Sequence, residues 1–291
     1  METFIAQLVS GLATGSTYAL ILTGMNLLLL VRGVVHFGYA YIVVMTMCVG
    51  WLVLGATDNN LYIAIPAFIV AGTAITILTE PLFRRLALKH AFLETLVMAQ
   101  GVAIILIEVI SHFINKGEVI AFPDNLTRGG AVFHFGKVSF SLPDIYTLAG
   151  SIVVVLVLLY ILYRRKQGRA IRAMAQSLET ARLLGIPFNR TGIYGFTIAG
   201  VLAGVIAILV SMTLGSASAG LGDVFSNKAI ILMLFAGAGN LIGGMVCAML
   251  IGIAEAMALF YLPGRWTDAI IFGIIMVAIL WRPGGMFGER T

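Results

Sequence analysis

The sequence predicts an all-α protein that crosses a membrane about eight times. Of its 291 residues, 60% are hydrophobic and 11% are charged, and the mean hydropathy is +1.04. A soluble domain carries about 25% charged residues, and so few charges would leave large apolar patches in contact with water. About 20 consecutive apolar residues are needed to cross a hydrocarbon core. Six uncharged runs have roughly this length or more: 3–31, 33–57, 59–79, 145–163, 191–222 and 229–254.

Two further segments complete the prediction of about eight spans. One is 95–114, which is interrupted by Glu108, and the other is 269–281. A Gly-rich stretch at 236–244 predicts that the last long run is broken or contains a re-entrant piece. Non-helical backbone at membrane depth persists only where protein buries it or where it lines a cavity. We expect residues 1–291 to form a single transmembrane domain.

The placement of the net charge of +5 predicts the orientation of the chain. Lys and Arg concentrate in segments 80–90 and 164–190, which two predicted spans separate. Cytoplasmic loops carry such an excess, so both segments are expected in the cytoplasm, together with the tail after Trp281. Segment 115–144 balances bases with acids and is expected to face outward. Charge confined to short loops is typical of an oriented multi-pass membrane protein, and it does not indicate nucleic-acid binding.

The longer basic segment predicts an amphipathic cytoplasmic helix over about 169–184. Its apolar residues recur at the spacing of one helical face. Glu179 and Arg182 lie three residues apart and can pair on the polar face. Gly185 is a natural C-cap. The expected helix therefore has about four turns and lies between two membrane spans.

Two interpretations of this helix remain open from the residues alone. It could lie on anionic lipid, which would suit its basic flanks. Alternatively, it could dock into a groove on a cytoplasmic protein. An alanine-rich face favours close packing against protein, and its members are Ala173, Ala175 and Ala181.

The same stretch resembles the coupling-helix segment of the branched-chain amino acid ABC permeases of the LivH type. The resemblance lies in RAMAQ at 172–176 and ARLLGI at 181–186. It extends along most of the chain in the order of that family, through GSTYAL at 15–20, GAGNLIGG at 237–244 with GIAEA at 252–256, and RPGGMFG at 282–288. Each motif is weak alone, but together and in this order they are a strong indication.

The resemblance implies an ATP-driven importer for branched-chain or related amino acids, in which this chain is the permease subunit. It implies four kinds of partner: a second permease subunit in a homo- or heterodimer, two cytoplasmic ABC ATPase subunits, a periplasmic substrate-binding protein, and the lipid membrane. It also implies that the cytoplasmic helix inserts into the ATPase. The expected coupling residues are Arg169, Arg172, Ala173, Met174, Ala175, Leu178, Glu179, Arg182 and Gly185.

The chain itself shows no pattern for enzymatic chemistry. It lacks the Gly-x-x-x-x-Gly-Lys-Ser/Thr loop that cradles nucleotide phosphates, so ATP and Mg²⁺ are expected in the partner ATPase subunits and no cofactor is expected here. The four histidines lack metal-ligand spacing, and Cys48 and Cys247 lie in apolar runs. We therefore expect neither a catalytic residue nor a metal site.

One departure from the family bears on the transported solute. Members tend to carry an Asn-Phe-Ala-His-Gly-Glu-like stretch after the first span, and here residues 36–41 read HFGYAY. Tyrosine thus replaces both the usual histidine and the acidic residue. The resemblance therefore leaves the solute open between branched-chain amino acids and the urea, short amides, other amino acids or aromatic acids that related importers carry. A stand-alone secondary transporter or channel is the alternative from a different class.

Polar residues within or beside the spans are the candidates for the translocation path, because ionisable groups at membrane depth are costly and usually face a cavity or a partner. In a secondary transporter, Glu94 or Glu108 would couple protons. The competing interpretation of Glu108 is hydration near the outer interface, and that of Glu94 is interfacial anchoring. The candidates are Asn26, His36, Tyr39, Tyr41, Glu94 and Glu108.

Overall fold

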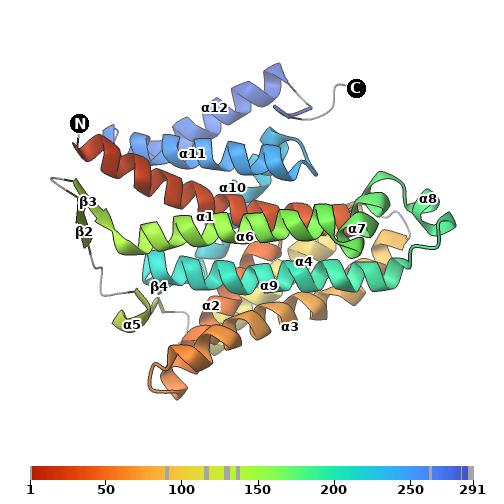
Figure 1. Ribbon diagram of the computed structural model, residues 1–291, viewed down its shortest axis with the longest axis horizontal. Helices are drawn as coiled ribbons and strands as arrows, with labels where there is room; N and C mark the ends of the chain where they lie inside the picture. The colour runs from red at the N-terminus through yellow and green to blue at the C-terminus, as the bar shows by residue number, and fades with distance from the viewer. Residues whose placement is uncertain are drawn as a thin grey trace.

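The computed structural model confirms an all-α polytopic membrane protein (Figure 1). It describes residues 2–88, 92–114, 118–127, 132–135, 138–261, 264–282 and 284–287. Among these residues, seven helices are long and apolar enough to cross a membrane. They are α1 (Glu2–Arg32), α2 (Tyr39–Ala56), α3 (Leu61–Leu88), α4 (Phe92–Phe113), α6 (Leu142–Arg164), α9 (Phe188–Leu214) and α11 (Leu241–Tyr261).

Shorter elements connect and flank the spans. The short helices are α5 (Asp124–Thr127), α7 (Lys166–Gln176), α8 (Leu178–Leu183), α10 (Leu221–Ala236) and the apolar α12 (Thr267–Trp281), which follows a 3-10 turn at Gly264–Trp266. Four short strands form two antiparallel pairs, β1 (Ile120–Ala121) with β4 (Ser216–Ala217) and β2 (Val132–Phe135) with β3 (Val138–Ser141). With α12, the count agrees with the predicted eight or so spans.

The two ends of the bundle differ in composition. Figure 1 shows α7 and α8 at one end, and the N-terminus with strands β2 and β3 at the other. The first end carries the basic residues of 164–190, and by the positive-inside rule it is the cytoplasmic end. Helix α1 accordingly begins on the outward side. Lys89 and His90, which belong to the other basic segment, lie outside the described residues.

Helices α1 and α11 are in close backbone contact along the bundle. A Cβ atom on Gly11 would lie 2.8 Å from the Cα of Ile253, and one on Gly15 would lie 2.8 Å from the Cα of Met249. A Cβ on Gly252 would collide with the backbone of Gly15. Helices in lipid associate through such small residues, because these let the backbones approach and gain dispersion energy. The glycines therefore set the distance between the two helices.

Helices α3 and α9 pack in the same manner. A Cβ on Gly200 would lie 2.6 Å from the Cα of Thr73, and one on Gly204 would lie 2.6 Å from the Cα of Ile69. Gly72, on α3, faces the same α3–α9 contact. These contacts join the second pair of close-packed helices in the bundle.

The predicted break near 236–244 is confirmed. Helix α10 ends at Ala236, its C-cap Gly237 has φ +100°, Gly239 has φ +86°, and α11 begins at Leu241. Both positive φ values lie where glycine avoids the strain that a side chain would cause. The backbone N–H of Met286 donates to Phe235 O at 2.7 Å, so the C-terminal segment covers the break and satisfies part of its backbone.

The predicted cytoplasmic helix differs in one respect: the structure has two helices where we predicted one over about 169–184. Ser177 is extended, with φ −157° and ψ 114°, and it separates α7 from α8. Its Oγ accepts a hydrogen bond from the Thr180 N–H at 3.2 Å. Serine competes in this way with helix continuation and is a preferred N-cap. The chain therefore turns at Ser177, and α8 projects from the bundle.

We expect Gly252→Ala to destabilise the protein, because the added Cβ would overlap the α1 backbone and overpacking costs about 1–3 kcal/mol. The matched control is Gly55→Ala, since a Cβ at Gly55 meets nothing within 4 Å. Both substitutions replace Gly by Ala within a helix, so the gain in helix propensity is the same in the two variants. Thermal unfolding in detergent should show a lower midpoint for Gly252→Ala alone, and equal midpoints would contradict the close contact.

Candidate functional site

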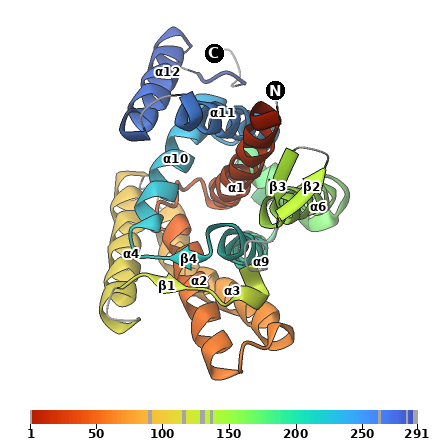
Figure 2. The same cartoon turned by 90° about the vertical axis from the view of Figure 1, so that its left-hand side faces the viewer.

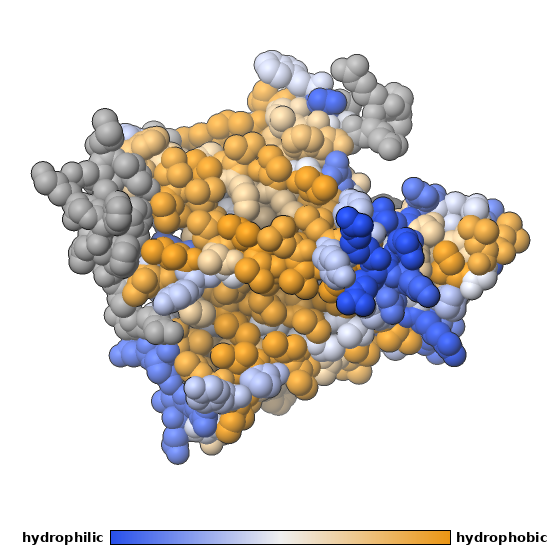
Figure 3. Space-filling model, viewed as in Figure 1, coloured by the Kyte–Doolittle hydropathy of each residue, from blue (hydrophilic) through white to orange (hydrophobic). Residues whose placement is uncertain are grey.

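The cytoplasmic end presents an apolar tip beyond a basic band. Leu183 is 89% exposed and Leu184 is 73% exposed, at the end of α8. Figure 3 shows hydrophobic surface at this tip, separated from the broad apolar belt of the spans by strongly hydrophilic surface. The exposed basic residues of the α6–α7 junction, which lie at this end of the bundle, are Arg164, Arg165, Lys166 and Arg169.

The predicted coupling residues divide into an exposed set and a packed set. The exposed residues are Arg169, Ala175, Glu179, Arg182 and Gly185. The others anchor the two helices: Met174 is buried, and Ala173, Leu178 and Arg172 are half-buried. The Arg172 guanidinium lies 4.5 Å from the Tyr163 ring centre. Sequence reasoning missed the two exposed leucines, because a helical-face pattern does not reveal that the chain turns at Ser177.

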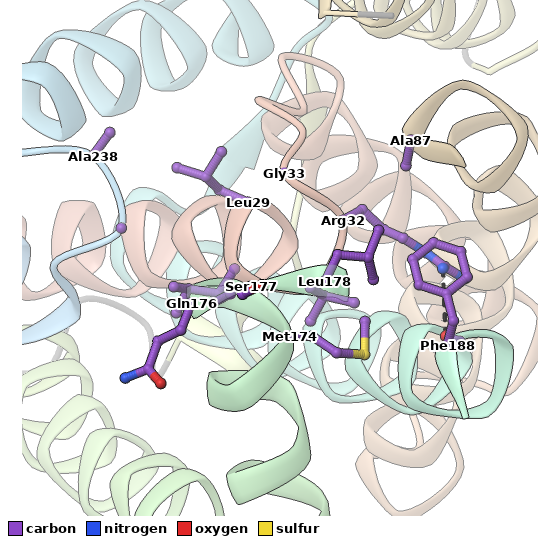
Figure 4. Close-up of a pocket in the computed structure, with 14 residues that line it drawn as sticks. Leu29, Arg32, Gly33, Ala87, Met174, Gln176, Ser177, Leu178, Phe188 and Ala238 are labelled. Atoms are coloured by element: carbon purple, nitrogen blue, oxygen red, sulfur yellow. Dashed lines mark hydrogen bonds between the residues drawn. The ribbon is translucent and has the colours of Figure 1, made fainter. Parts of the chain in front are cut away.

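A cavity of about 410 Å³ lies beneath the α7–α8 junction. Figure 4 shows residues from α1, α3, α7, α8, α9 and the 238–239 turn around it, with Arg32 and Phe188 on one side and Ala238 on the other. The lining is mixed apolar and polar. The cavity therefore places the projecting helices next to both the end of α1 and the break before α11.

A buried ion pair closes the wall of this cavity. The Arg32 guanidinium, which is fully buried, donates to the Glu80 carboxylate and lies 4.1 Å from the centre of the Phe188 ring. Arg84 Nε lies 3.8 Å from the second Glu80 oxygen. The pair joins α1, α3 and α9 at their cytoplasmic ends. The sequence indicated this pair only in that Arg32 and Glu80 each directly follow an uncharged run.

Three of the predicted path residues are fully buried. Asn26 Oδ1 accepts from the Gly239 N–H at 3.1 Å, so it supports the break before α11. The His36 ring lies 4.3 Å from the Phe83 ring, centre to centre. The Tyr39 hydroxyl donates to Ala199 O at 2.9 Å. In this conformation these side chains hold helices together.

The other three predicted path residues reach different surfaces. The Tyr41 hydroxyl donates to the Asp223 carboxylate in the first turn of α10. Glu94 is exposed in the first turn of α4. The Glu108 side chain is 61% exposed, and its Oε2 lies 3.0 Å from His112 Nδ1. The chain by itself therefore does not gather the six predicted residues into one site.

Sequence reasoning also missed a charged cluster within the bundle. Lys228 Nζ lies 2.5 Å from Glu255 Oε1, donates to the Tyr18 hydroxyl at 3.0 Å, and lies 3.4 Å from Asp268 Oδ1. This cluster joins α10 to α1, α11 and α12. In the sequence, Lys228 lies between the apolar runs 191–222 and 229–254. This position could have indicated the cluster, since a charge at membrane depth requires a partner. Elsewhere, the described residues contain no group of three or more His, Cys, Asp or Glu placed to hold a metal ion.

The helical fold, the basic cytoplasmic end and the projecting α7–α8 pair define a multi-pass membrane protein with a cytoplasmic projection. The chain belongs to the family described as branched-chain amino acid transport system, permease component, which matches residues 7–280. This confirms the resemblance found in the sequence, and with it the class of ABC permeases and a multi-pass location in the inner membrane.

Individual relatives agree over almost the whole chain. The chain is 28% identical to the high-affinity branched-chain amino acid transport system permease protein BraD of Pseudomonas aeruginosa, over 98% of this chain and 96% of that protein. It is 26% identical to the corresponding protein LivH of Escherichia coli K12, with the same coverage. One chain of PsaBC from Streptococcus pneumoniae, in complex with Fab, superposes with a TM-score of 0.50 at 10% identity. That superposition covers 93% of this chain and 90% of the other, and it shows the fold alone.

We expect the Lys228–Glu255 pair to behave as a unit. Lys228→Met alone would leave the buried Glu255 carboxylate without its cation and lower the free energy of unfolding by about 3–5 kcal/mol. Glu255→Leu alone should cost less, because Lys228 keeps Asp268 Oδ1 at 3.4 Å. The double variant removes both charges and should cost less than the sum. A double-mutant cycle of unfolding in detergent measures this coupling. Additive costs would show that the two side chains do not interact energetically.

Proposed function

We propose that this chain is the permease subunit of an ATP-driven importer that carries amino acids, branched-chain or related, delivered by a periplasmic binding protein. The observation that carries the proposal is the apolar tip formed by Leu183 and Leu184 beyond the basic band. Membership of the permease family supports the importer role, and the names of BraD and LivH support the solute class.

The position of the tip favours protein docking over lipid binding. A helix that lies on a membrane buries its apolar face by only about 5–10 Å at the level of the headgroups. Here the basic residues Arg164 and Arg165 would occupy the headgroup level, since they end the last span before α7. The leucines follow α7 and lie further into the cytoplasm. Exposed leucines in that position gain stabilisation by entering a groove on a protein.

The proposed coupling pathway runs from this tip to the cavity. ATPase closure would displace α8, and the buried side chains Ile171 and Met174 would transmit the movement through α7. Met174 and Leu178 line the cavity together with Arg32. Movement of the α7–α8 pair would therefore reach the Arg32–Glu80 junction of α1 and α3. ATP and Mg²⁺ act in the two partner ATPase subunits.

A second permease subunit is part of the proposal. Glu108 and His112 expose charged or polar side chains in the last two turns of α4, toward its outward end, where water at the interface or a second subunit would have to surround them. A homo- or heterodimer would cover this face or enclose it in a water-filled path. If uptake persists after ATP depletion and collapses with an uncoupler, the pair instead supports a stand-alone proton-coupled transporter.

We expect the double variant Leu183→Asp/Leu184→Asp to abolish ATP-dependent uptake while the protein still inserts and folds. Both side chains are exposed, so the fold does not depend on them, but a charged tip cannot enter an apolar groove. The measurements are uptake in cells and co-purification of the ATPase subunits with the permease.

The matched control is Leu183→Met/Leu184→Met, which preserves the apolar tip and should retain uptake and ATPase binding. Wild-type uptake by the aspartate variant would remove the docking assignment. Loss of uptake with full ATPase retention would place the defect after docking.

A further inference from the structure

Helix α10 begins inside the thickness of the membrane. Tyr41 is the third residue of α2, so 15 residues, about 22 Å, separate it from the outward end of that helix. The Tyr41 ring contacts the position of Gly222, and its hydroxyl binds Asp223. A hydrocarbon core is about 30 Å thick. The first turn of α10 therefore lies well below the outer surface.

A second contact places the start of α2 at the same depth below the outer surface. The Tyr39 hydroxyl binds Ala199 O, and Ala199 lies about 22 Å from the outward end of α9, at Leu214. The indole N–H of Trp51, on the outward side of Tyr41, donates to Ala121 O in the β1–β4 pair at 3.0 Å. The chain thus leaves β4 near the outer side and returns inward before α10 starts. Figure 2 shows α10 running crosswise between α2 and α11.

Two faces of α10 carry polar groups of different kinds. Lys228 is buried and pairs with Glu255, as described above. Asp223 and Asn227 are exposed and lie one turn apart on another face. Among the described residues, no cationic side chain lies within 4.0 Å of the Asp223 carboxylate, and its partner there is the Tyr41 hydroxyl. An exposed carboxylate at this depth requires water or a cation.

We propose that Asp223, oriented by Tyr41, faces the aqueous translocation path and accepts the ammonium group of an amino-acid solute. The proposal rests on the proposed function, because it names the group that the path would recognise. A carboxylate is the partner that an ammonium group prefers, through charge-assisted hydrogen bonds. The Tyr41 hydroxyl occupies one carboxylate oxygen and fixes the direction of the other. Tyr41 is a positioning residue in this arrangement.

The first experiment tests whether water reaches the Asp223 face of α10, and it does not depend on transport. Both native cysteines, Cys48 and Cys247, are buried, so Asn227→Cys can be labelled in the full-length protein with small cationic and anionic methanethiosulfonates. We expect the cationic reagent to react about tenfold faster or more, because a charged cleft concentrates its counter-ion. Adding Asp223→Asn should remove most of this preference, and adding Tyr41→Phe should reduce it.

A lipid-facing site serves as the matched control. Leu156 on α6 is 61% exposed, and Leu156→Cys should be unreactive to both charged reagents. No reaction at Asn227→Cys would mean that lipid or the second permease covers this face, and it would overturn the proposal. A preference that Asp223→Asn leaves unchanged would overturn it as well.

The second experiment tests the solute group in the reconstituted transporter with its ATPases and binding protein. Asp223→Asn should lower amino-acid uptake about tenfold or more, the loss expected for one charge-assisted hydrogen bond. ATP hydrolysis stimulated by the loaded binding protein should stay within about twofold, since Asp223 is remote from the α7–α8 end. The matched control is Asp58→Asn, an exposed acid at the outward turn after α2, which should transport normally.

The outcomes separate this proposal from the proposed function. Normal uptake by Asp223→Asn in an active complex would remove the role of Asp223 and leave the importer assignment intact. If the wild-type complex carries no amino acid with ATP, the importer assignment fails and the ammonium assignment fails with it. The labelling result would then still show whether α10 faces water.

Discussion

The backbone contact between α1 and α11 is the constraint on which the rest of the bundle depends. Gly11, Gly15 and Gly252 remove the side chains that would otherwise separate the two helices. In lipid there is little hydrophobic drive for helices to associate, so close packing and internal polar contacts must supply the stability. Helix α1 is the most enclosed of the spans, and three of its residues reach features described above: Tyr18 at the charged cluster, Asn26 at the break, and Arg32 at the cytoplasmic cavity.

Charged groups inside the bundle occur where three or more helices meet. The Arg32–Glu80 pair joins α1 and α3 beside α9, and the Lys228–Glu255 pair joins α10 and α11 beside α1. An ion pair in a low-dielectric interior gives little net stability over a well-packed apolar contact, but breaking one is costly. Such pairs therefore specify which helices meet and at what register. The glycine seams set how closely the helices approach, and the ion pairs set which surfaces face one another.

Much of the fold could be predicted from the sequence, because lipid imposes strong rules on length, charge and backbone hydrogen bonding. The spans, the break at 236–244 and the clustering of basic residues at one end followed from those rules. The turn at Ser177 did not, since it depends on one side-chain hydrogen bond that competes with an otherwise regular helical pattern. The candidate site was harder still. Polarity in a span indicates that a residue has a partner, but only the three-dimensional structure distinguishes Asn26, which supports a turn, from Tyr41, which meets an exposed acid. Residues such as Leu183 were missed because exposure is a property of the fold.

The inward return of the chain before α10 has a mechanical consequence. Helix α10 has 16 residues and is about 24 Å long. Its first turns are attached to the start of α2 through Tyr41 and through the Ser226 hydroxyl, which donates to Phe37 O at 3.1 Å. Its last residue adjoins Gly237, and the turn at 238–239 lines the cytoplasmic cavity. Helix α10 therefore connects the start of α2 to the wall of the cytoplasmic cavity, and a displacement of that wall would be carried along the helix to its first turn, well inside the membrane.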